Sequence, residues 1–139
     1  MRKRVLTSAI SFILICSLFT SLALAATLRA SKYISSYNAV IYSSGNEITV
    51  DCSITGTGRM KTIGIKSVKI YTSSGTNVAT YSYTTDGYEY LMGSDTGRKT
   101  ASVSYTGVSG RSYYAVVTFY VSDGSGSDSR THTTKTITL

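Results

Sequence analysis

His132 and Cys52 are the side chains whose chemistry would suit a nucleophilic enzyme. Nucleophilic catalysis needs a base and an orienting group beside the nucleophile. His132 stands between two threonines without a partner motif, so we expect a solvated residue on an edge strand. Cys52 belongs to a series of apolar residues at every second position, with polar residues between them. This pattern predicts a buried thiol that behaves as a small hydrophobic side chain. The sequence therefore predicts no nucleophilic active site.

The acidic residues do not form a recognisable catalytic pair. Glu47 and Asp51 share one face of a predicted strand at a separation of roughly 13 Å, which exceeds the range for either geometry of glycoside hydrolysis. Asp86, Glu89 and Asp95 lie in predicted loops. An enzyme with an unrecognised loop site stays the third-ranked alternative, and we expect the chain not to be an enzyme.

The segment 123–128 has oxygen-bearing side chains at alternating positions, as calcium loops do. It lacks the closing bidentate glutamate and is not followed by a helix. We expect a flexible hairpin tip between the last two strands, and neither a metal site nor a cofactor.

The twelve tyrosines are the most informative residue class, because an exposed ring with a hydroxyl can stack on sugars or anchor a protein partner. Tyr81 and Tyr83 point the same way on a predicted strand, and Tyr88 and Tyr90 follow closely. These four are the candidate ligand contacts. The alternative, which we favour, is that tyrosine covers half-buried strand faces.

A leader precedes the part of the chain that must fold. Arg2, Lys3 and Arg4 are followed by an apolar run and by the small residues Ala23 and Ala25, the layout of a secretory signal. The sequence predicts a signal peptide over residues 1–25, formed as a helix, and a single domain over residues 26–139. Cleavage after Ala26 and retention of the leader as an anchor are the alternatives. We therefore expect a secreted protein, extracellular or associated with the cell envelope.

Charge and cysteine content narrow the partners of the mature chain. Cleavage removes three basic residues and leaves eleven against seven acidic ones, a net charge of +4. The basic residues are scattered from Arg29 to Lys135, unlike the clustered stripe of a nucleic-acid-binding protein. Cys52 has no partner for an intramolecular disulfide, so the fold depends on packing. We expect no nucleic-acid partner, and membrane contact only through the leader before cleavage.

The periodicity of the mature chain is two throughout. Ile48, Val50, Cys52 and Ile54 alternate with polar residues, which predicts a strand with one buried face. The run from Tyr113 to Val121 is apolar on both sides and predicts a central strand. Between turn residues, the predicted strands are 30–42 with a break near 35–36, 47–55, 65–72, 78–84, 100–106, 113–121 and 129–139. Gly56 and Gly58 predict a turn or bulge that re-aims Met60 into the core.

About seven antiparallel strands in this length match an immunoglobulin-like, fibronectin type III-like β-sandwich, which is the predicted all-β fold. Cys52 occupies the place of the first immunoglobulin cysteine. Tyr113, after the turn 108–112, resembles the tyrosine corner, whose hydroxyl bonds backbone a few residues upstream. Ala115 stands where the second cysteine would be, and the chain has no tryptophan, so the resemblance is closer to the fibronectin type III style.

A narrower resemblance rests on the segments 29–34 (RASKYI) and 55–60 (TGTGRM) and on Ile63-Gly64. The sequence resembles an uncharacterised family of small secreted proteins of Gram-positive bacteria. That resemblance implies export and a β-domain and adds no active site. The predicted function is a non-enzymatic interaction module whose partner is an unknown protein or a cell-surface glycan. The alternative is a stand-alone carbohydrate-binding module that uses the four candidate tyrosines.

Overall fold

The computed structural model describes residues 31–139; the predicted leader and its cleavage site lie outside the described residues. The described part is all-β, as predicted, and its seven strands form one antiparallel sheet. The elements are β1 (Ile34–Ser44), β2 (Glu47–Thr72), β3 (Asn77–Ser82), the 3₁₀ helix η1 (Glu89–Leu91), β4 (Met92–Thr106), β5 (Ser112–Ser122), β6 (Ser127–Thr133) and β7 (Ile137–Thr138).

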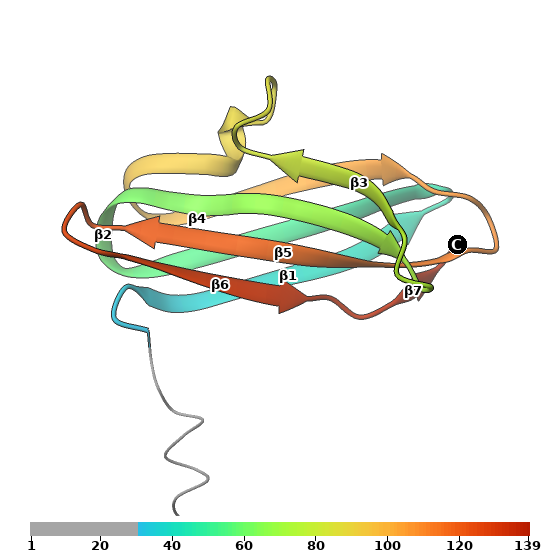
Figure 1. Ribbon diagram of the computed structural model, residues 1–139, viewed down its shortest axis with the longest axis horizontal. Helices are drawn as coiled ribbons and strands as arrows, with labels where there is room; N and C mark the ends of the chain where they lie inside the picture. The colour runs from blue at the N-terminus through green and yellow to red at the C-terminus, as the bar shows by residue number, and fades with distance from the viewer. Residues whose placement is uncertain (1–30) are drawn as a thin grey trace, which may run out of the picture. The chain divides into compact units, whose positions relative to one another are not determined.

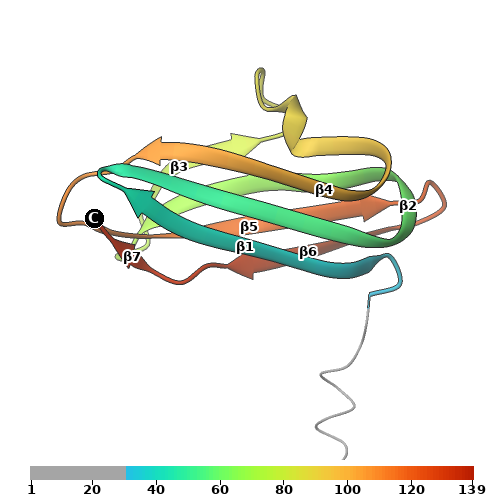
Figure 2. The same ribbon diagram turned by 180° about the vertical axis from the view of Figure 1, so that it is seen from behind.

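The sheet curls over itself into two layers that share β2. The first half of β2 lies between β1 and β4, and its second half lies between β3 and β5. β6 and the short β7 pair with the other side of β5. Figure 1 shows the four-stranded layer of β3, β2, β5 and β6 in front, and Figure 2 shows the three-stranded layer of β1, β2 and β4 from behind.

The length of β2 differs from the prediction. The predicted strands 47–55 and 65–72 are one strand of 26 residues, because the chain bends between the layers without leaving extended backbone. The predicted bulge is confirmed: the register with β4 shifts between Thr55 and Met60, and Met60 is buried. A Cβ on Gly56 would lie 2.8 Å from Met60 Cγ, so glycine makes room for the re-aimed side chain.

β4 follows the same bend and is longer than the predicted strand 100–106, because the residues before it, which resemble a turn in sequence, are also extended. Thr96 pairs with Met60 and Met92 pairs with Gly64, so β4 crosses between the layers alongside β2. The strands lie too close for a side chain at Gly64, where a Cβ would lie 2.8 Å from Met92 Cα. The glycine, serine and aspartate residues of this segment usually indicate turns, but here they lie in a bent pair of strands.

The predicted inward rows are confirmed. Ile48, Val50, Cys52 and Ile54 are at most 4 % exposed and face the β5 row that runs from Tyr113 to Val121. Each fully buried Ile, Val or Phe contributes about 1.5–3 kcal/mol relative to exposure. The side chains of the two inner faces form one hydrophobic core. The fold therefore stands on packing, with Cys52 as a free buried thiol.

The tyrosine hydroxyl behaves as predicted. Tyr113 is 1 % exposed, and its hydroxyl accepts a hydrogen bond of 2.9 Å from the backbone N–H of Val108. Its ring also meets Tyr105 of β4 edge-on, with ring centroids 6.0 Å apart. Tyr113 thus joins β5 to the connection that leaves β4.

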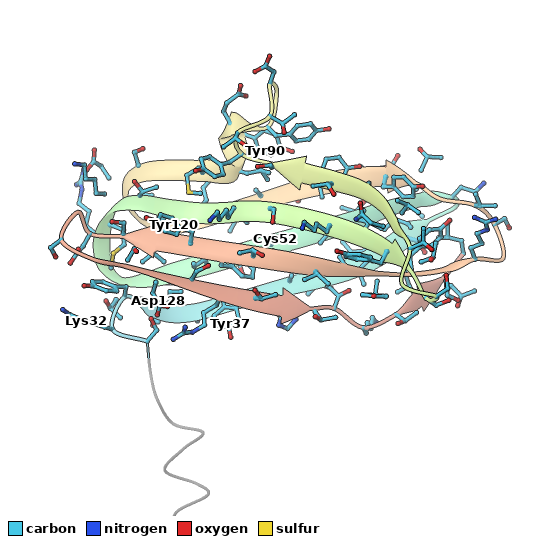
Figure 3. The ribbon with its side chains drawn as sticks, viewed as in Figure 1. Lys32, Tyr37, Cys52, Tyr90, Tyr120 and Asp128 are labelled. Atoms are coloured by element: carbon cyan, nitrogen blue, oxygen red, sulfur yellow. The ribbon has the colours of Figure 1, made fainter. Side chains whose placement is uncertain are left out.

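Both ends of the described chain depart slightly from the predicted strands. β1 has the predicted irregularity as a register shift between Ile34 and Ser36. The predicted strand 129–139 is split into β6 and β7. At the break, the N–H of Ala115 donates to the Thr134 hydroxyl and not to a backbone carbonyl of a paired strand. Ser31 donates a hydrogen bond from its hydroxyl to the carboxylate of Asp128, which fixes the start of the described chain on β6. Asp128 is labelled in Figure 3.

Candidate ligand-binding face

The structure brings three of the four candidate tyrosines together. The ring centroids of Tyr81 and Tyr88 are 5.1 Å apart, and those of Tyr88 and Tyr90 are 6.1 Å apart. Tyr83 lies one residue beyond the end of β3 and makes no ring pair with these three. Tyr81, Tyr83 and Tyr88 are half-buried against the core, whereas Tyr90 is 46 % exposed.

Two of these tyrosines are bonded to the outer edge of β4. The Tyr81 hydroxyl donates to the carbonyl of Ser104 at 2.7 Å, and the Tyr90 hydroxyl donates to the carbonyl of Ser102 at 2.9 Å. Burial, followed by the neighbouring tyrosines, raises the pKa of Tyr81 above its ordinary value, and burial likewise raises the pKa of Tyr90. Tyr81 is therefore a structural residue that closes the gap between β3 and β4, and Tyr90 alone keeps a large free ring surface.

A hollow of about 360 Å³ lies on the outer face of the three-stranded layer. It is formed where two cross-strand rows lie side by side, and its polar lining is Asn38, Ser53 and Thr100 in one row and Asp51 and Ser102 in the other. Small side chains make the floor. At ~4.8 Å per strand spacing, β1 and β4 are roughly 10 Å apart across it.

Asp51 is the charged group of the hollow. One carboxylate oxygen accepts a hydrogen bond of 3.1 Å from the Tyr42 hydroxyl, and the other accepts one from the Ser102 hydroxyl. The bond to Asp51 raises the pKa of Tyr42. Tyr42 is 46 % exposed, as Tyr90 is, so exposed rings flank the hollow on the β1 side and at the β4 edge.

The side chains that could do covalent chemistry are kept apart. Burial raises the pKa of the Cys52 thiol to about 12, so the thiolate is not accessible near neutral pH. His132 lies on the edge strand β6, as predicted, but it is partly buried and not solvated as expected, because it pairs with the inward-facing Val117 and its ring lies edge-on to Tyr37 at 6.4 Å. Asp51 and Glu47 share the outer face of β2, four residues apart. Within residues 31–139, no three His, Cys, Asp or Glu side chains are placed to hold a metal ion.

The tip of the β5–β6 hairpin lies within the predicted segment 123–128 but is shorter, because Ser127 and Asp128 already belong to β6. Asp123 accepts hydrogen bonds from the backbone N–H groups of Ser125 and Gly126 and from the Ser125 hydroxyl, and these bonds lower its pKa. The carboxylate is thus used by the turn itself.

Sequence reasoning missed the hollow. One signal was present: Val40 and Tyr42 are exposed apolar residues on the polar side of β1, where the alternation calls for polar side chains. The remaining lining residues are serine, threonine and asparagine, which have no distinguishing pattern in sequence.

Among residues 31–139 there is no helix long and apolar enough to cross a membrane. Comparison of the chain with protein-family models and with curated proteins gave no match.

Proposed function

We propose that this chain is an exported, non-enzymatic interaction module that binds a neutral glycan in the hollow of the three-stranded layer. The observation that carries the proposal is the hollow itself, with Asp51 and Asn38 in its lining and the exposed rings of Tyr42 and Tyr90 on two sides. Sites for sugars combine an apolar surface for the ring with a few placed polar groups for the hydroxyls. The width of roughly 10 Å suits one or two sugar rings.

A binding role is favoured over catalysis by the state of Asp51. Both of its oxygens already accept hydrogen bonds, and it is the single carboxylate in the lining of the hollow. Hydrolysis of a glycosidic bond needs a second carboxyl group across the bond. The hollow therefore suits recognition of hydroxyl groups.

The immunoglobulin-like or fibronectin type III-like character of the sandwich is part of this proposal. If the two halves of β2 are counted as separate strands, the first, second and fifth strands form one layer and the others form the second, as in that fold. The Tyr113 hydroxyl bond to Val108 supports it. The leader and the resemblance to small secreted proteins of Gram-positive bacteria support export to the cell envelope or extracellular surface.

A glycan array followed by calorimetry with the best ligand tests the function. Thr100→Phe fills the hollow and is expected to weaken binding at least tenfold. Thr131→Phe, at a threonine on β6 that is also exposed, is the matched control and is expected to change nothing. Absence of binding above background, or equal losses in the two variants, would refute the proposal.

The alternative platform of Tyr81, Tyr83, Tyr88 and Tyr90 has its own test. Tyr90→Ala should weaken binding in either case, because Tyr90 belongs to both surfaces. Tyr88→Ala should weaken it only if the tyrosine row is the platform. A loss with Tyr88→Ala and none with Thr100→Phe would move the site to the row.

A further inference from the structure

A second hollow, of about 450 Å³, lies at one end of the domain between the β2–β3 turn and the connection from β4 to β5. Figure 1 shows these two segments at the same end of the molecule. The hollow is lined by five hydroxyl side chains and one guanidinium: Thr72, Ser73, Ser74, Thr76, Ser112 and Arg111. Its lining residues differ from those of the first hollow, and it lies at the end of the four-stranded layer.

The walls of this second hollow are held together by backbone bonds. The N–H of Ser73 donates to the carbonyl of Ser112 at 2.9 Å, and the Leu139 N–H donates to the carbonyl of Arg111 at 3.0 Å. Gly110 N–H in turn donates to Leu139 O at 2.8 Å. The segment that carries Arg111 is therefore fixed before any ligand binds, which reduces the entropy lost on binding.

Arg111 is an exposed cation without a carboxylate partner. Within residues 31–139 the single ion pair joins Arg130 to Asp128, and none of the seven acidic side chains lines the hollow. A guanidinium surrounded by hydroxyl donors is suited to an oxyanion, because it offers two parallel N–H bonds to phosphate or carboxylate.

The outer face next to the hollow carries stacked tyrosine rings and exposed lysines. Tyr71 and Tyr114 stack with ring centroids 5.4 Å apart and planes 13° apart, directly beside the hollow. One pleat further along β2 lies Lys69, exposed and paired with Val116. Lys66 is also exposed, and the outward residues of β2 and β5 in this layer include no carboxylate. Figure 3 shows Tyr120 further along β5, on the same layer.

We infer that this end of the four-stranded layer binds an anionic polysaccharide, with one phosphate or carboxylate in the Arg111 hollow, a sugar ring on the Tyr71–Tyr114 stack and a second anionic group at Lys69. The span from Ser73 to Lys69 is roughly 13 Å by strand rise, which is longer than a single inorganic anion. The occupant is therefore an oligomer. Its site is independent of the neutral-glycan hollow on the other layer.

The test is a titration of the ¹⁵N-labelled protein with four probes: inorganic phosphate, a phosphodiester-linked glucose hexamer, a galacturonate hexamer and neutral maltohexaose. At least one anionic hexamer is expected to shift the amide signals of Ser73, Ser112 and Tyr114, and to bind at least tenfold more tightly than phosphate. The two hexamers distinguish phosphate from carboxylate as the anionic group. Binding should weaken as salt is raised.

Variants separate the site from general attraction to a basic protein. Arg111→Gln is expected to weaken binding of the hexamer about tenfold and Lys69→Gln about threefold. Arg98→Gln, an exposed arginine in the three-stranded layer, is the matched control and should change binding less than twofold. Thr100→Phe should have no effect, so failure of this site and failure of the neutral-glycan site are distinguishable.

Several results would overturn the inference. Equal losses in the Arg111 and Arg98 variants would mean non-specific attraction. Maltohexaose binding as tightly as the anionic hexamers would remove the charge argument. A duplex DNA of similar charge that bound more tightly than either hexamer would assign the face to nucleic acid instead.

Discussion

The two halves of β2 carry opposite charges on their outward faces. Glu47 and Asp51 lie on the first half, in the three-stranded layer, and Lys66 and Lys69 are exposed on the second half, in the four-stranded layer. The inward sides of both halves are equally apolar. A single strand thus contributes apolar side chains to one shared core and gives the two outer faces opposite charges. The net charge of the chain does not reveal this difference between the faces.

The largest expected effect concerns the bend that separates the halves. Gly64→Ala places a Cβ against the backbone of Leu91 and Met92, so β4 must move or β2 must straighten. We expect the free energy of unfolding to fall by about 3 kcal/mol. Gly58→Ala, at a position with open space around its Cβ, should change it by less than about 1 kcal/mol. Denaturant titration measures both, and similar values would show that the close approach at Gly64 is not required.

A smaller loss of stability is expected from breaking the hydrogen bond between Tyr113 of β5 and the connection that follows β4. Tyr113→Phe removes the acceptor for the Val108 N–H and should cost about 1–3 kcal/mol. Tyr114→Phe, on the outward side of β5, is the control and should cost less than about 0.5 kcal/mol. Thermal unfolding of the pair would contradict this account if the outward variant were the less stable one.

The smallest expected effect is a pH dependence of stability that comes from the buried thiol in the first half of β2. Cys52 in the first half has its pKa raised from 9.0 to about 12 by burial, so the unfolded chain loses the proton first. Its contribution to stability is complete below pH 9 and is lost as the pH rises toward 12, by roughly 1.4 kcal/mol at pH 10. Cys52→Ala should remove this slope between pH 9 and 10. An unchanged slope would assign it to other groups, and rapid labelling of the folded thiol at pH 8 would contradict its burial.

The inward rows were predictable because burial enforces a strict alternation. Cys52 and Ile54 are inward for that reason, and the Tyr113 bond was predictable from one residue and its turn. The continuity of β2 was not, because the Thr-Gly-Thr-Gly run at its bend has the composition of a loop. The sequence gives the positions of the glycines, but the reason that glycine is needed is the close approach of the neighbouring chain, which the sequence does not show.

The candidate site was predictable in residue type and not in position. Tyr81 and Tyr90 are both tyrosines near β4, yet the first is half-buried and the second has a free ring. That distinction depends on the element that carries each residue, because Tyr81 lies within β3 and Tyr90 lies in η1. Hollows lined by serine and threonine, such as the one around Ser53, depend on cross-strand register, which the one-dimensional pattern does not contain.

The bonds from Tyr81 and Tyr90 to β4 also bear on how the molecules behave when crowded. A strand border with free acceptors is a template on which another copy can add its own strand and begin a fibril. Here the Ser102 and Ser104 carbonyls are already occupied from within the same chain. These two carbonyls are therefore not free to accept a strand from another copy of the chain.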